Sequence, residues 1–353
     1  MFDLNSLIRP HIRNIAPYSS ARDEYSGTEG VFLDANENPF GSTTGEAFNR
    51  YPDPYQHALK VRIGEIKGAR PEQIFLGNGS DEAIDLLYRA FCVPEQDEAV
   101  LLPPTYGMYQ VSADINGIMT RRVELTEDYQ LDPESVKKVI SGQSKLIFIC
   151  SPNNPTGNLL DPDAIEQVLR IFPGLVIIDE AYIDFADHPG FVSRLDEFPN
   201  LVVLQTFSKA WGMANLRLGM AFASPEIIKV LNKIKPPYNV SGLTQERVLV
   251  ALQHVEAKDN MVQSLLAERI RMADALGRLP QIKHVYASDA NFLLVRVEDP
   301  DDFYNYLIGR RVIVRNRSRV VLCEGCLRLS IGSAEENNQL LLAMSEYAVT
   351  QTS

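Results

Sequence analysis

Residues Thr206–Gly219 read TFSKAWGMANLRLG, and this stretch decides the fold. The apolar run Leu201–Gln205 precedes it and predicts a strand, so the stretch begins where that strand releases polar side chains into a loop. Two upstream segments repeat the arrangement: Leu146–Cys150 leads into SPNNPTG, and Leu175–Ile178 leads into DEAY. Ligands of α/β proteins bind at the carboxyl ends of strands, so we expect the three polar segments to build one site.

The lysine of this stretch is the candidate nucleophile. A lysine after Thr-Phe-Ser is usually a solvated surface residue, but Lys209 follows a predicted strand and is flanked by Trp211. A lysine forms Schiff bases when it is partly desolvated and close to other cations. Thr206, Ser208 and Arg217 add two hydroxyls and a guanidinium, which are groups that bind phosphate.

An acid and a tyrosine follow the preceding predicted strand. Asp179 would lie at the carboxyl end of that strand, with Tyr182 just after it. The alternatives are a capping or metal-binding acid, or the Asp-Glu pair of ATPases, a class whose phosphate loop the sequence lacks. Together with Asn154 and Lys209, these residues suit an aldehyde with a basic ring, because an acid keeps a pyridine nitrogen protonated. The sequence therefore predicts pyridoxal phosphate (PLP) as cofactor.

A glycine-rich turn is a second candidate phosphate contact. Gly77–Glu82 read GNGSDE, after a predicted strand and before a helix that begins near Asp81. Glycines let the backbone approach an anion, and the free amides of a helix N-terminus favour phosphate. The turn matches neither the P-loop nor GxGxxG, so taken alone it is more simply an ordinary strand-to-helix turn capped by Ser80 or Asp81.

Composition excludes several functional classes. A net charge of -12 over 353 residues argues against nucleic-acid binding, which needs a basic face. No basic segment followed by an apolar core stands at the start, and the apolar runs are strand-sized, so we expect a cytoplasmic protein that does not cross a membrane. Cys323 and Cys326 have CxxC spacing, but no second ligand pair lies near them, and we expect no metal site.

Continuous apolar runs alternate with helical patterns, which predicts an α/β fold with helices on both faces of a mostly parallel sheet. The expected strands are Gln73–Leu76, Ala99–Leu102, Lys145–Cys150, Leu175–Ile178, Leu201–Gln205 and Leu218–Phe222. Helical periodicity over Thr244–Leu279, as one helix or two, leads into a smaller α+β domain. Its expected elements are strands at Asn291–Val297, Arg311–Val314 and Leu327–Ile331 and a closing helix over 333–348. We expect an N-terminal arm over 1–44, a large domain over 45–243 and a small domain over 244–353.

The sequence resembles the fold type I PLP-dependent aminotransferases and, among them, the histidinol-phosphate aminotransferases. The resemblance covers nearly the whole chain and is carried by APY (Ala16–Tyr18), NENP (Asn36–Pro39), RYP (Arg50–Pro52), GNGSDE, PPTYGMY (Pro103–Tyr109), SPNNPTG, DEAY, SKA (Ser208–Ala210) and CLR (Cys326–Arg328). The three central motifs are specific to the superfamily. Assignment to the histidinol-phosphate group is less specific, because aromatic aminotransferases of the same subgroup share most of the pattern. The resemblance implies a seven-stranded sheet and a homodimer with shared active sites, whose N-terminal arm packs on the small domain or the partner.

The resemblance also implies a role for individual residues. Lys209 would carry the cofactor covalently and shuttle a proton, and Asp179 would hold the ring nitrogen. Asn154 and Tyr182 would bind the phenolic oxygen, while Tyr106 would stack on the ring. The cofactor phosphate would be bound by Ser80, Asp81, Thr206, Ser208 and Arg217, and by Tyr51 from the partner subunit.

A basic segment near the end of the chain is the candidate for substrate recognition. In an extended chain Arg315, Arg317 and Arg319 would share one face. A solvated positive edge explains most of these arginines, but in an acidic protein such a concentration suits an anionic substrate. The resemblance assigns substrate binding to Tyr18, Asn36, Arg315 and Arg328.

The implied reaction is transamination between L-histidinol phosphate and 2-oxoglutarate, giving imidazole acetol phosphate and glutamate. Arg315 and Tyr18 would bind the substrate phosphate, and Arg328 the α-carboxylate of glutamate. Three alternatives stay open: an aromatic amino acid aminotransferase, a PLP-dependent decarboxylase of a phosphorylated amino acid, and a non-catalytic ligand-sensing protein. The presence of Lys209, Asp179 and Arg328 together argues against the last of these.

Overall fold

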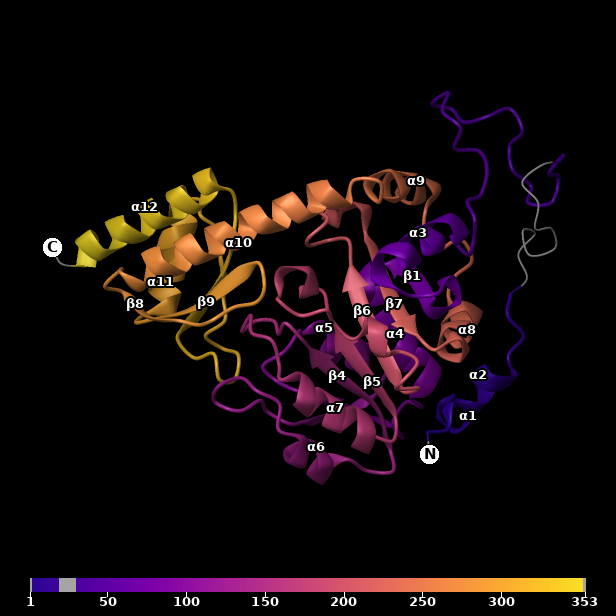
Figure 1. The fold of residues 1–353 in the computed structure, drawn as a ribbon, viewed down its shortest axis with the longest axis horizontal. Coiled ribbons are helices and arrows are strands. Elements are labelled where there is room, and N and C mark those ends of the chain that lie inside the picture. Colours follow the sequence, from indigo (N-terminus) through magenta and orange to yellow (C-terminus); the bar gives the residue numbers. More distant parts are fainter. Residues whose placement is uncertain (1, 19–29, 352–353) are drawn as a thin grey trace.

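The computed structural model describes residues 2–18 and 30–351, which form a large and a small lobe joined by a long helix (Figure 1). The strands of the large lobe are β1 (Ile74–Asn78), β2 (Glu98–Leu101), β3 (Met119–Arg122), β4 (Ser144–Cys150), β5 (Leu175–Asp179), β6 (Leu201–Thr206) and β7 (Leu218–Ala223). They form a seven-stranded sheet in the order β1-β7-β6-β5-β4-β2-β3. Within it β7 runs antiparallel to its neighbours and the other pairs are parallel, so the predicted mostly parallel sheet is confirmed.

Helices cover both faces of this sheet. They are α3 (His57–Lys67), α4 (Gly79–Phe91), α5 (Met108–Ile115), α6 (Pro133–Val139), α7 (Pro162–Ile171), α8 (Pro225–Ile234) and α9 (Gly242–Ala251). Ile147 and Ile149 of β4 pack in the core that contains Val168 of α7. Phe148, between them, packs in the opposite core with Leu87 of α4. Because both faces are covered, the central strands are apolar throughout, which explains the unbroken apolar runs of the sequence.

The small lobe contains a four-stranded antiparallel sheet that packs against three helices. The helices are α10 (Val255–Gly277), α11 (Pro300–Gly309) and α12 (Ala334–Gln351). The strands are β8 (Ile282–Val285), β9 (Phe292–Val297), β10 (Arg315–Asn316) and β11 (Cys326–Ser330), in the order β10-β11-β9-β8. The expected smaller α+β unit is therefore present. The helical periodicity of Thr244–Leu279 divides between α9 and α10, with a break between Leu252 and His254.

Three strands differ from the sequence prediction. β3 and β8 were not expected, because both are short and largely solvent-facing, so neither contains an apolar run. Arg311–Val314, expected as a strand, is irregular chain before β10, and Arg311 has a left-handed φ of 61°. The strand is instead Arg315–Asn316, which pairs with β11.

The N-terminal arm has two described parts. The short helices α1 (Leu4–Leu7) and α2 (Pro10–Asn14) lie at the start of the expected arm, and Leu7 and Ile12 pack in the same core as α4 and α8. Residues 30–51 extend away from the large lobe instead (Figure 1). Along this segment Phe40 is 96% exposed. Val31 and Leu33 of the same segment are 89% and 85% exposed, and several exposed apolar side chains in one segment are typical of a surface that another chain covers.

Two kinds of feature are absent from the described ranges. None of the helices there is long and apolar enough to cross a membrane. No group of His, Cys, Asp and Glu side chains in the same ranges could hold a metal ion.

Candidate active site

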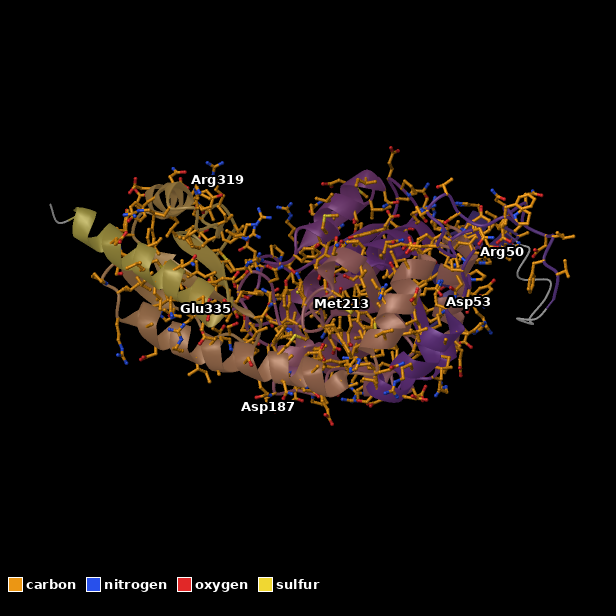
Figure 2. The ribbon with its side chains drawn as sticks, turned by 90° about the horizontal axis from the view of Figure 1, so that it is seen from above. Arg50, Asp53, Asp187, Met213, Arg319 and Glu335 are labelled. Atoms are coloured by element: carbon orange, nitrogen blue, oxygen red, sulfur yellow. The ribbon has the colours of Figure 1, made fainter. Side chains whose placement is uncertain are left out.

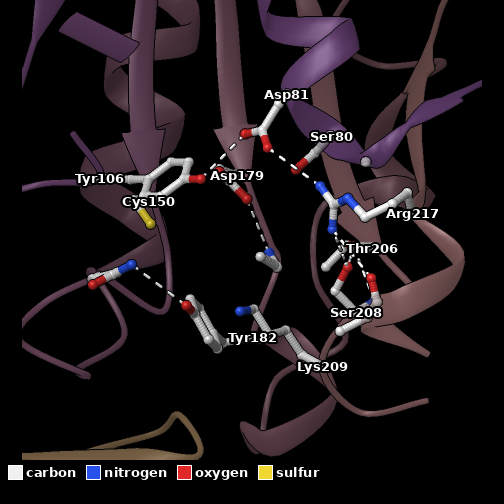
Figure 3. A pocket seen from close by; sticks show the side chains of 14 residues that line it. Ser80, Asp81, Tyr106, Cys150, Asp179, Tyr182, Thr206, Ser208, Lys209 and Arg217 are labelled. Carbon is white, nitrogen blue, oxygen red and sulfur yellow. Dashed lines mark hydrogen bonds and ion pairs between the residues drawn. The ribbon is translucent and has the colours of Figure 1, made fainter. Parts of the chain in front are cut away.

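The carboxyl ends of three adjacent parallel strands meet at one cavity (Figure 3). Asp179 ends β5 and lies in register with Cys150 of β4 and Leu204 of β6. The loop after β4 contains Asn154, and the loop after β6 contains Lys209. A cavity of about 160 Å³ opens there, and the predicted site residues that line it are Ser80, Asp81, Tyr106, Asn154, Asp179, Tyr182, Thr206, Ser208, Lys209 and Arg217.

Asp179 is a buried acid, with 3% of its surface exposed. Its Oδ2 accepts a hydrogen bond from the Tyr109 hydroxyl at 2.6 Å, and its Oδ1 accepts one from the Ala181 amide at 3.1 Å. Burial raises the pKa of this carboxyl to about 6, although both donors oppose that rise. Each carboxylate oxygen has further acceptor capacity, so the acid can receive another donor from the cavity.

Lys209 lies at the opposite wall, with Nζ 5.5 Å from the ring centroid of Tyr182 (Figure 3). Burial lowers the pKa of its ammonium, and the positive charge of Arg328 lowers it further. Both effects favour the uncharged amine, which is the nucleophilic form. Beside it, the Asn154 amide donates to the Tyr182 hydroxyl at 3.4 Å.

The remaining wall of the cavity carries groups that can bind an anion. α4 begins at Gly79, so its first backbone amides point outward without helical partners. The Thr206 hydroxyl donates to Ser208 Oγ at 3.0 Å, and Arg217 Nη1 lies 3.5 Å from the same oxygen. Gly79 has a left-handed φ of 71°, which favours glycine, and a Cβ there would lie 2.6 Å from Arg217 Nη2 and displace the guanidinium. Asp81 balances this arginine from 3.6 Å away.

These groups fit PLP. A pyridinium N–H would satisfy the buried carboxylate of Asp179, and a phosphate would satisfy Arg217, Ser208 and the amides that begin α4. Lys209 would supply an amine for the aldehyde, and Tyr182 a phenol for the ring oxygen. The negative charge of Asp179 would therefore face the positive ring nitrogen, and the positive charge of Arg217 would face the negative phosphate.

A second cavity, of about 200 Å³, adjoins the first and contains three arginines. It is lined by Arg315, Arg317 and Arg328, and it shares Lys209 and Tyr182 with the first cavity. Among the described residues of its lining, none is acidic. Burial lowers the pKa of Arg317 and of Arg328, and the Nε of each is buried without a hydrogen-bond partner in the described chain.

The register of the small sheet creates this cluster. Arg315 of β10 lies directly opposite Arg328 of β11 in the antiparallel ladder. Like charges placed opposite each other destabilise a sheet, so this arrangement calls for an anion between them. Arg328 is oriented by Asn154, whose Oδ1 accepts from its Nη1 at 2.5 Å, and by the ring of Phe292 at 5.1 Å.

Comparison with known proteins places this geometry in a family. Residues 28–344 match the family described as aminotransferase class I and II. The chain belongs to the class I and II aminotransferases. The histidinol-phosphate aminotransferase of Cytophaga hutchinsonii is 55% identical to it over 346 residues, which is 98% of this chain and 99% of that one.

Two solved structures share the fold of this aminotransferase. The histidinol-phosphate aminotransferase of Clostridium acetobutylicum has a TM-score of 0.80 at 24% identity, over 86% of this chain and 92% of that chain. The Sinorhizobium meliloti enzyme, solved in complex with pyridoxal-5'-phosphate, has a TM-score of 0.78 at 22% identity, over 90% of each chain. The expected fold type I architecture is thereby confirmed.

Three predicted site residues lie outside both cavities of their own aminotransferase chain. Tyr18 is 71% exposed and borders a shallow groove beside Tyr55. Tyr51 is 51% exposed and stacks on Tyr238 at 4.5 Å, in a larger groove that Asn36 also lines. The roles predicted for these residues therefore require a second chain or a movement of the arm.

The structure also corrects the reading of the basic segment. Arg317 lines the second cavity, a position that the alternate spacing after Arg315 would have indicated. Arg319 does not share their face, because a turn follows β10, and its side chain lies exposed on the small lobe (Figure 2). Tyr109 was missed as well, since no local pattern distinguishes a tyrosine that binds Asp179 from a core tyrosine.

Borohydride reduction in the presence of PLP is expected to attach the cofactor to Lys209, the lysine that lines both cavities. Lys60 is an internal control, because burial lowers the pKa of its ammonium to about 8 although it lines neither cavity. Peptide mass analysis locates the label. Label on Lys60, or label retained by Lys209→Ala, contradicts the assignment.

Proposed function

We propose that this aminotransferase transfers an amino group between L-histidinol phosphate and 2-oxoglutarate in histidine biosynthesis, with PLP as its cofactor. The products are imidazole acetol phosphate and glutamate. The supporting observation is the second cavity, where three arginines border Lys209 and none of the described lining residues is acidic. Relatives named histidinol-phosphate aminotransferase, at 46% to 55% identity over nearly the whole chain, support the same substrate.

The first cavity would hold the cofactor. PLP, when bound, supplies an electron-withdrawing ring that stabilises negative charge at the substrate Cα. Asp179 would keep a proton on the ring nitrogen, while Tyr182 and Asn154 would bind the phenolic oxygen. Lys209 would then take the proton from the substrate Cα, because its lowered pKa favours the uncharged base.

The second cavity would orient the two substrates in turn. Glutamate presents an α-carboxylate, for which Arg328 is placed beside Asn154. Histidinol phosphate has no carboxylate, so its phosphate must supply much of the specific binding. Arg315 and Arg317 are the guanidiniums available for that phosphate, and each could donate charge-assisted hydrogen bonds to it.

Arg315→Leu is expected to lower kcat/KM for histidinol phosphate by roughly 10- to 150-fold, which corresponds to about 1.5–3 kcal/mol for one charge-assisted contact. Arg319→Leu is the matched control, because this exposed arginine lies in the same segment but outside the cavity. Steady-state rates with histidinol phosphate and with phenylalanine are measured for both variants. A wild-type preference for phenylalanine that Arg315→Leu leaves unchanged would instead indicate an aromatic aminotransferase.

We also infer a homodimer with shared active sites. The loop that contains Tyr51 is held by Glu37, which accepts from the Tyr51 amide at 2.6 Å and pairs with Arg50 at 2.6 Å. This ordered loop borders a groove of about 750 Å³ at the outer side of the large lobe. A second copy of the chain would cover this groove and the exposed side chain of Phe40.

Mixing inactive Lys209→Ala with inactive Tyr51→Ala is expected to restore about a quarter of the wild-type activity. In a random mixture about half of the dimers are mixed, and one of their two sites is intact. The matched control mixes Lys209→Ala with Asp179→Ala, because both residues belong to the cavity of one chain and no mixed dimer has an intact site. Equal activity in the two mixtures, after subunit exchange has been demonstrated, counts against a contribution of Tyr51 across the interface.

We propose the cytoplasm as the compartment of this enzyme. Its four cysteines are free and buried, which fits a reducing environment.

A further inference from the structure

Tyr109 lies behind the wall of the first cavity, and the mechanism above does not use it. It belongs to α5, is fully buried and lines neither cavity. Its hydroxyl donates to Asp179 Oδ2 at 2.6 Å, while the Ala181 amide donates to Oδ1. The carboxylate is therefore held through both oxygens from within the protein.

The position of Tyr109 is itself determined by tight packing. Its ring stacks on Phe148 of β4, with 4.8 Å between centroids, and its backbone carbonyl accepts from the Tyr88 hydroxyl at 3.0 Å. On its other side it meets the ring of Tyr106 edge-on at 5.5 Å. Tyr106 lines the cavity, so Tyr109 contacts two cofactor-facing side chains without reaching the cavity itself.

The hydrogen bond opposes the effect of burial on Asp179. Burial raises the pKa of this carboxyl to about 6, and donation from Tyr109 is the largest effect that lowers it. Burial and the charge of Asp179 raise the pKa of Tyr109 well above its usual value, so its hydroxyl stays a neutral donor. A donor of this kind stabilises the ionised carboxylate, which is the form that can keep a ring nitrogen protonated.

We propose that Tyr109 is a positioning residue, whose hydroxyl keeps Asp179 ionised and oriented toward the cofactor. The inference rests on the proposed use of PLP, but it does not depend on which amine the enzyme accepts. One hydrogen bond between a phenol and a carboxylate thus governs how cofactor affinity depends on pH.

Tyr109→Phe removes the hydroxyl and keeps the ring packing. The dissociation constant of PLP is measured by titrating the apoprotein between about pH 5 and pH 9, for the wild type, Tyr109→Phe and Tyr347→Phe. Tyr347 is the matched control, because it is a buried tyrosine whose hydroxyl donates to Asp302 Oδ2 at 2.7 Å in the small lobe.

Loss of the donor raises the pKa of Asp179, so the charged form is lost at a higher pH as the solution is acidified. For a rise of about one unit, PLP binding by Tyr109→Phe is expected to be about tenfold weaker than wild type at pH 5, about twofold weaker at pH 7 and equal at pH 9. KM of the holoenzyme for glutamate stays within about twofold, because Tyr109 does not line the second cavity. Tyr347→Phe follows the wild-type curve.

A Tyr109→Phe curve that coincides with the Tyr347→Phe curve overturns the proposal. So does a loss of affinity by the same factor at every pH, since a purely structural role has no pH signature. Should Tyr109→Phe fail to fold, 3-fluorotyrosine at position 109 keeps the ring and donates more strongly. It is expected to shift the acid limb of the affinity curve to lower pH, and an unmoved limb overturns the proposal.

The proposed substrate and the proposed role of Tyr109 can be contradicted independently. A wild-type protein that binds PLP but does not use histidinol phosphate contradicts the substrate and leaves the role of Tyr109 standing. A wild-type protein that does not bind PLP contradicts both.

Discussion

The burial of the Asp179 carboxylate is the constraint on which the rest of the site depends. An acid taken out of water tends to become neutral unless donors or cations compensate it. The protein supplies two donors from behind, the Tyr109 hydroxyl and the Ala181 amide, and leaves the cavity side for a ligand. The parallel sheet makes this arrangement possible, because β4, β5 and β6 end together and deliver Asp179, Asn154 and Lys209 to one place.

The second cavity has the opposite feature, an excess of positive charge. Arg315 and Arg328 face each other across a β ladder, and Arg317 joins them in a cavity whose described lining has no acid. Without a ligand this cluster costs stability, because like charges repel and the buried Nε atoms of Arg317 and Arg328 have no hydrogen-bond partner in the described chain. An anionic substrate would remove that cost, so the residues that weaken the free protein would also favour a phosphate or a carboxylate as ligand. Local conflicts of this kind are expected at functional sites.

Much of the fold could be predicted from the sequence, since a central strand covered on both faces must be apolar along its length. Leu175–Ile178 and Leu201–Gln205 could be recognised for that reason, and they correspond to β5 and β6. Edge strands that face solvent carry no such signal, unlike the buried edge strand β1. β3 and β8 are largely exposed, and β10 is only the pair Arg315–Asn316, so their existence depends on the partner strand and not on their own residues.

The sequence by itself determined the residues that follow the central strands, because a strand end and its loop are contiguous in the chain. Asp179, Tyr182 and Lys209 could therefore be named as candidates before their geometry was known. Tertiary structure alone decided which distant groups reach them. Tyr109 binds Asp179 across a separation of 70 residues, and Arg328 contacts Asn154 across 174. Tertiary structure likewise decided that Tyr18, Asn36 and Tyr51 lie outside the cavities of their own chain. Such contacts arise from sheet register and lobe packing, which no local pattern of residues encodes.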